Sequence, residues 1–146
     1  MKTIAIVLSS FFFTLTGTAQ ETEKNEIQTL KIAFITNALN LSPESAQKFW
    51  PIYNKYESLG KELQTEMNCT VYDRMDDLGT MKEKASEELL KNYLELRDKE
   101  QALRKAYVSE LKTIISAREI MQLKKAEYDF HKKLLQEYRA GNQSGK

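Results

Sequence analysis

Cysteine, proline and glycine are all scarce in this chain of 146 residues. Cys69 is the only cysteine, so no disulfide can form within the chain, and any disulfide would have to join two chains. Two prolines and five glycines leave few places where a helix must stop. The chain also lacks a charge of one sign, because its 22 basic and 21 acidic residues are interleaved. This balance predicts solvated helix faces and no nucleic-acid partner.

The residues that usually carry catalysis are missing as well. His131 is the only histidine, and no nucleophile motif, glycine-rich phosphate loop or paired buried carboxylates accompany it. We therefore expect no enzyme activity and no cofactor. Glu127 lies four residues before His131, and Cys69 precedes three aspartates, Asp73, Asp76 and Asp77. A selective metal site usually needs about four convergent ligands. We predict no metal site, and we expect His131 to be half-buried.

The longest apolar run is short and lies at the start of the sequence. Lys2 precedes an apolar stretch from Ile4 to Phe13, and the small residues Gly17, Thr18 and Ala19 follow it. This order is typical of a secretory signal peptide, and the run is too short to span ~30 Å of hydrocarbon. We predict a signal peptide over residues 1–19, a single domain over 20–140 and a disordered tail over 141–146. The expected location is the periplasm, with no membrane span after signal removal.

Apolar residues in the remaining chain recur in steps of three and four, which predicts an all-α fold with four helices. The predicted helices run roughly from Glu26 to Leu39, from Pro43 to about Leu78, from just after Gly79 to Ile114, and from just after Ser116 to Tyr138. In the first of these the apolar stripe consists of Ile27, Leu30, Phe34 and Ala38. In the second, Phe49, Tyr53 and Tyr56 lie on the stripe and are expected in the core, with Trp50 as an anchor beside them.

Two similar phrases mark helix starts. In the first, Leu41 precedes Ser42 as the capping residue and Pro43 as the first helical residue. In the second, Ile115 precedes a capping box made by Ser116 and Glu119. Thr80 and Glu83 suggest a third box of the same kind.

The two central helices are expected to form a curved hairpin roughly 50 Å long, bent at Pro51 and with its tip at Gly79. The outer helices, of about 14 and 22 residues, are expected to pack at its base and to leave the tip uncovered. The distal apolar stripe could be covered by the two arms of the hairpin themselves or by a second copy of the chain. We predict a homodimer with this stripe as the partner or dimer surface, formed by Leu63, Met67, Val71, Met75 and Met81.

The phrases "LSPESAQKFWPIYNKYE" and "SAREIMQLKKAEYDFHKKLL", together with the signal peptide and two long helices, resemble the Spy/CpxP-like periplasmic proteins with LTxxQ motifs. They are especially similar to the helical secreted proteins of Bacteroidota labelled sensors of ECF-type sigma factors. In the Spy manner, the resemblance implies a cradle-shaped dimer that holds unfolded envelope proteins without ATP. In the CpxP manner, it implies a signalling accessory that reports envelope stress or heavy metal to a membrane-bound regulator.

Overall fold

The structure is a computed structural model that describes residues 17–143, and it is all-α over that range with no strand. Its elements are α1 (Gly17–Leu39), α2 (Pro43–Met67), the π-helical segment η1 (Asn68–Tyr72), α3 (Asp73–Met75), α4 (Glu83–Leu111) and α5 (Ala117–Gln143). The predicted fold class, with four main helices, is confirmed. Residues 1–16 of the predicted signal peptide and 144–146 of the predicted tail lie outside the described residues. No helix in the described part is both long enough and apolar enough to cross a membrane.

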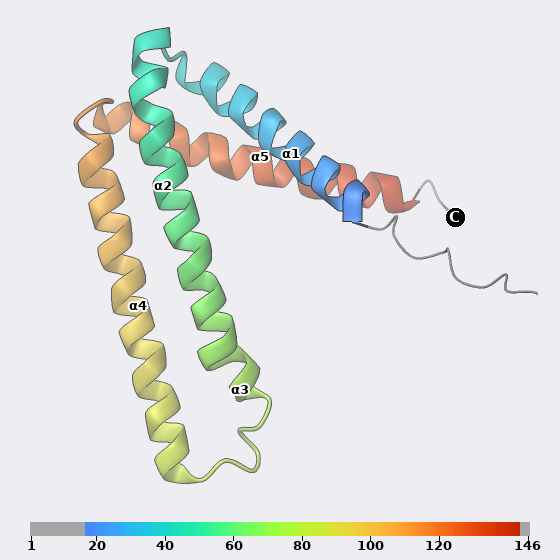
Figure 1. Cartoon of the computed structure of the whole chain (residues 1–146), viewed down its shortest axis with the longest axis vertical. Helices are drawn as coiled ribbons and strands as arrows, with labels where there is room; N and C mark the ends of the chain where they lie inside the picture. Colours follow the sequence, from blue (N-terminus) through green and yellow to red (C-terminus); the bar gives the residue numbers. More distant parts are fainter. Residues whose placement is uncertain (1–16, 144–146) are drawn as a thin grey trace, which may run out of the picture.

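The helices form two arms that meet at one end of the molecule (Figure 1). α2 and α4 make the predicted antiparallel hairpin, and α1 pairs with α5 in a second arm that leaves the base of the hairpin sideways. Because α1 has 23 residues and α5 has 27, both are longer than the sequence predicted. α5 therefore extends for about 40 Å. The outer helices meet the hairpin at its base as expected, and their free lengths pack against each other.

The main core lies at the base, where all four long helices meet. Its buried side chains come from every one of them: Ile35, Leu39, Phe49, Tyr53, Tyr56, Tyr107, Leu111, Ile115, Ile120, Leu123 and Ala126. The prediction that Phe49, Tyr53 and Tyr56 are core residues is confirmed. Trp50 is half-buried against this core, with its ring centroid 5.1 Å from that of Phe49. Burial of these aromatic side chains stabilises the base, where the four helices meet.

The buried face of α1 differs from the predicted stripe. Ile35 and Leu39 are buried, whereas Ala38 is exposed and Leu30 is 50% exposed. One residue corresponds to a rotation of about 100° around a helix, so the stripe was placed too far to one side. The difference arises from how α1 packs against the other helices. Ile35 and Leu39 belong to the main core at the base, whereas Phe34 of the predicted stripe is half-buried against Phe130 of α5, with 5.6 Å between the ring centroids.

A second cluster fills the distal half of the hairpin. Met67, Val71, Leu89 and Leu96 are buried there, with Leu63, Met81 and Tyr93 packed against them. The apolar residues of this part of α2 and η1 follow each other in steps of four, which drift around a regular helix by about 40° per step. A π-helical turn holds more residues than an α-helical one. The η1 segment therefore keeps Val71 on the same face as Met67.

The hairpin tip departs from the predicted cap. Thr80 does not cap the following helix, because Lys82 is its N-cap residue and makes no side-chain cap hydrogen bond. The Thr80 hydroxyl instead donates to the Asp77 carbonyl, 3.2 Å away. The backbone amide of Thr80 donates to the same carbonyl over 3.0 Å. Thr80 therefore stabilises the turn and does not cap a helix, and α4 begins only at Glu83.

Candidate binding groove

A groove of about 320 Å³ runs along the hairpin and ends in the corner where α1 and α5 leave it. All four long helices contribute to its lining: Lys31, Tyr53, Tyr56, Glu57, Gly60, Leu63, Gln64, Met67, Arg97, Glu100, Leu103, Arg104, Tyr107, Lys124 and Glu127. Along α2 the lining extends from Tyr53 to Met67. Fourteen residues of helix correspond to about 21 Å. The groove is therefore long enough for an extended segment of about six residues.

Three tyrosine rings form the floor at the corner end. The ring centroid of Tyr107 lies 5.0 Å from that of Tyr56 and 6.5 Å from that of Tyr53. Leu63, Met67 and Leu103 continue this apolar floor toward the tip. The Tyr56 hydroxyl donates over 2.8 Å to Glu110, which is not part of the lining. Tyr53, Tyr56, Tyr107 and Met67 are at most 9% exposed, so the floor presents only a small part of these side chains to a ligand, and the half-buried Leu63 and Leu103 present more.

Ion pairs form the rim of the groove. Glu57 binds Lys31 of α1 at 2.6 Å and Lys61 at 3.3 Å. Glu100 binds two guanidinium groups, those of Arg97 at 2.7 Å and Arg104 at 2.8 Å. A further pair joins Lys124 and Glu127 of α5 at 2.8 Å. Apolar floor and charged rim together give the groove an amphipathic lining.

The protonation states of the lining follow from these contacts. Hydrogen bonds from Arg97 and then Arg104 hold the pKa of Glu100 below its usual value, although partial burial opposes them. Burial, reinforced by the Glu127 and Glu57 carboxylates, raises the pKa of Tyr107 well above its ordinary value. Burial, together with the same two carboxylates, also raises the pKa of Tyr53. Both phenols therefore remain protonated and can donate a hydrogen bond near neutral pH.

Tyr107 has an unusual hydroxyl. The side chain is 9% exposed, and its hydroxyl oxygen is buried without a hydrogen-bond partner. A buried polar group without a partner costs about 1–3 kcal/mol of stability. The Lys124 ammonium lies 5.2 Å from the centroid of the same ring. Because Lys124 is a long and partly exposed side chain, its movement would open the corner end of the groove to a ligand.

Gly60 leaves open space in the groove. It lies inside α2, where glycine costs about 1 kcal/mol relative to alanine. A Cβ atom added there would meet no other atom within 4 Å, so no contact inside the chain requires a glycine. Its missing side chain keeps the middle of the groove free for the backbone of a ligand.

The predicted cap residues lie together at the base of the hairpin, away from the lining of the groove. Ser42 caps α2, and its hydroxyl oxygen accepts from the Ser45 amide over 3.2 Å. The second motif forms a reciprocal capping box. The backbone amide of Glu119 donates to the Ser116 hydroxyl over 3.3 Å, and the backbone amide of Ser116 donates to the Glu119 carboxylate over 2.7 Å. The two caps are therefore present as predicted from the sequence. Leu41 and Ile115, which precede them, pack in or against the main core, and Pro43 begins α2.

The predicted partner surface is partly interior. Met67 is 3% exposed and Val71 is fully buried between the two arms of the hairpin, so neither forms an outer surface as predicted. Leu63 and Met81 are half-buried against the same cluster, and Leu63 also lines the groove. Of the five predicted residues, only Met75 is exposed, at 38%. The hairpin arms thus cover most of this stripe themselves, which was the alternative left open by the sequence.

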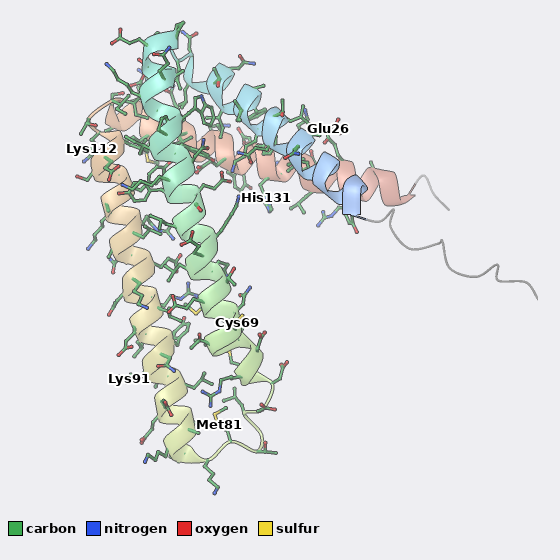
Figure 2. The ribbon with its side chains drawn as sticks, viewed as in Figure 1. Glu26, Cys69, Met81, Lys91, Lys112 and His131 are labelled. Carbon is green, nitrogen blue, oxygen red and sulfur yellow. The ribbon has the colours of Figure 1, made fainter. Side chains whose placement is uncertain are left out.

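The residues considered as metal ligands lie apart from the groove or are already paired. His131 on α5 is exposed, not half-buried as predicted, and Cys69 is exposed on the distal hairpin (Figure 2). Glu127 pairs with Lys124. Within the described residues no group of three or more histidine, cysteine, aspartate or glutamate side chains is arranged to hold a metal ion.

Comparisons with protein-family models, with curated proteins and with solved structures gave no match for this chain. The groove was not predicted from the sequence. Its lining residues on α2 and α4 belong to the recognised apolar stripes or flank them, but the contributions of Lys31, Lys124 and Glu127 depend on where the second arm lies. Gly60, a glycine inside a helix, is a local signal that could have indicated the groove, but no such prediction was made from it.

Proposed function

We propose that the chain is a periplasmic binding protein of the chaperone type, which holds unfolded segments of envelope proteins without ATP. The observation that carries this proposal is the groove itself, with its tyrosine and aliphatic floor, its rim of ion pairs and its open centre at Gly60. An unfolded segment exposes apolar side chains together with unpaired backbone groups. A concave amphipathic surface satisfies both kinds of group without requiring a particular sequence.

The two-armed shape supports the same proposal. The two arms are joined at one base, and the groove is long enough for about six residues of extended chain. Such a site fits transient holding of a chain better than enclosure of a small substrate. The sequence resemblance to Spy/CpxP-like proteins and the predicted signal peptide lead to the same cellular setting, the bacterial envelope.

The test is suppression of client aggregation by the purified chain, followed by light scattering in the absence of nucleotide. Gly60→Leu should fill the groove and reduce the protection, because the added side chain enters open space lined by the floor residues. Gly79→Leu is the matched control, since the same change at the hairpin tip also meets no other atom. Equal protection by both variants, with helicity unchanged, would rule out the groove as the client site.

A homodimer is also part of the proposal. The distal hairpin presents Met75 at 38% and Leu78 at 51% exposure beyond the reach of α1 and α5. A second copy is the simplest cover for such a surface. Sedimentation of the purified chain at several concentrations tests it, and a monomer at all of them would refute it.

The second candidate is a signalling accessory that acts on a membrane-bound regulator of envelope stress. Met121, Tyr128 and Leu135 on α5 favour it, because they are 67%, 67% and 43% exposed and recur every seven residues along one outer face. Such a line of apolar side chains can dock on a partner helix. Tyr128→Glu should then change the output of a stress reporter in the native host while client protection stays intact. Unchanged reporter output together with reduced client protection would favour the chaperone.

A further inference from the structure

We infer that the groove selects segments that carry a carboxylate beside apolar side chains, and that Arg104 and Tyr107 of α4 form the carboxylate subsite. This inference rests on the proposed function and names the class of segment that the groove holds. The occupant is an acidic, partly apolar stretch of unfolded polypeptide.

The charges of the lining favour an acidic segment. Four cationic side chains line the groove against three carboxylates: Lys31, Arg97, Arg104 and Lys124 against Glu57, Glu100 and Glu127. Glu57 also binds a further lysine, Lys61, from outside the lining. Two of the three carboxylates are thus shared between two cations each, which leaves cationic capacity for a ligand.

Arg104 is the cation that can be redirected at least cost. Arg97 is held in place, since it binds Glu100 at 2.7 Å, donates to the Tyr72 hydroxyl over 3.1 Å and lies 5.2 Å from the centroid of the Tyr93 ring. Arg104, whose side chain is 69% exposed, pairs with Glu100 at 2.8 Å. If Arg104 turns to a ligand carboxylate, Glu100 keeps its bond to Arg97. The exchange therefore leaves no carboxylate of the protein without a partner.

Tyr107 supplies a donor for the same group. Its hydroxyl is buried without a partner and remains protonated, so it can donate to an acceptor oxygen. A carboxylate only accepts hydrogen bonds, and an arginine can bind it through two N–H groups at once. Arg104 and Tyr107 are three residues apart on α4, which places them on the same face within about 5–6 Å. This distance separates the Cβ atoms, and the Tyr107 hydroxyl itself is buried. One ligand carboxylate can therefore contact both side chains once the Lys124 side chain, whose ammonium lies over the Tyr107 ring, moves aside.

The open space at Gly60 favours a polypeptide as the carrier of the carboxylate. Gly60 lines the groove across from α4, and it leaves room where a chain backbone would pass. An acyl chain would gain more from an apolar side chain at that position than from its absence. The glycine thus favours a peptide over a fatty acid as the source of the carboxylate.

The experiment compares three labelled peptides by fluorescence anisotropy. In each, leucine alternates with glutamate, glutamine or lysine, so that apolar content and length are matched. Wild-type protein should bind the glutamate peptide about tenfold more tightly than the glutamine peptide, the ratio expected for one charge-assisted hydrogen bond. Arg104→Gln should abolish this preference. Lys105→Gln removes a positive charge from the adjacent position, which is exposed and lies outside the lining, and should leave the preference for the glutamate peptide unchanged.

Tyr107→Phe separates a binding role from a structural one. Removal of a buried hydroxyl without a partner should raise the melting temperature, and it should also weaken binding of the glutamate peptide. A rise in melting temperature with unchanged peptide affinity would overturn the assignment of Tyr107 to the subsite.

Equal affinity for all three peptides, together with client protection, would overturn the inference and leave the proposed function standing. If the chain neither binds the peptides nor protects clients, both the inference and the proposed function are overturned. Displacement of the glutamate peptide by decanoate at equal or lower concentration would overturn the assignment to polypeptide.

Discussion

The ion pair between Lys31 and Glu57 joins the second arm to the hairpin, and its removal is the sharpest test of how the two arms are held. The Nζ of Lys31 lies 2.6 Å from the Oε1 of Glu57, and the two side chains are only 20% and 19% exposed. Glu57 has a second partner in Lys61 at 3.3 Å, whose side chain is 65% exposed. Within the described residues Lys31 makes no second ion pair, although its ammonium lies 5.2 Å from the centroid of the Tyr53 ring.

The unequal number of partners predicts unequal costs. Lys31→Met keeps the aliphatic stem of the side chain and leaves Glu57 bound to Lys61, so it should cost about 1 kcal/mol of unfolding free energy. Glu57→Gln removes the carboxylate from both lysines and leaves Lys31 four-fifths buried. A hydrogen bond to a charged group contributes about 1.5–3 kcal/mol, so this change should cost about 2 kcal/mol. The double variant should cost less than the sum by about 1 kcal/mol.

The assay is chemical unfolding at neutral pH, followed by circular dichroism for the helices and by Trp50 fluorescence for the base. Trp50 packs against the main core, so its signal reports on the region where the arms meet. Equal costs for the two single variants would refute the argument from unequal partners. Full additivity in the double variant would show that the two side chains do not interact.

The same pair predicts how stability depends on pH. Burial raises the pKa of Glu57, but the hydrogen bond and charge of Lys31, with help from Lys61, outweigh burial and hold the pKa below the ordinary 4.5. The unfolded chain therefore takes up this proton at a higher pH than the folded chain. The stabilisation is present above the ordinary pKa and is lost as pH falls through the lower, folded value. The difference between wild type and Glu57→Gln should accordingly shrink below about pH 4.5, and a constant difference would contradict this account.

Two further predictions concern the caps and the hairpin. Ser116→Ala should cost about 1 kcal/mol of unfolding free energy, the usual loss for a cap. Adding Glu119→Ala to it should cost less than Glu119→Ala alone, because both residues belong to one capping box. Thermal melting of the single and double variants checks this, and an unchanged melting temperature would contradict it. Met67→Glu should destabilise strongly since it buries a charge, whereas Met75→Glu should leave stability within about 0.5 kcal/mol and dissociate a tip-to-tip dimer. An intact dimer in Met75→Glu, measured by sedimentation, would place the interface elsewhere.

The sequence by itself determined the helices, most of their buried faces and two of their starts. Capping boxes and helical stripes depend on residues three and four apart, and such residues are neighbours on a helix whatever the rest of the chain does. That is why the box at Ser116 and Glu119 and the core positions Phe49, Tyr53 and Tyr56 were predicted correctly. The Thr80 prediction was wrong because the turn itself uses the hydroxyl of this residue.

Only the tertiary structure decided how the outer helices lie and what they create. Nothing within α1 specifies that it pairs with α5 away from the hairpin, because that choice depends on contacts such as Phe34 with Phe130, which are almost a hundred residues apart. The groove follows from the same choice, since Lys31 and Lys124 reach its corner end only when the second arm leaves the base sideways. Long-range packing has no counterpart in local sequence spacing, and the candidate groove of this protein is built from it.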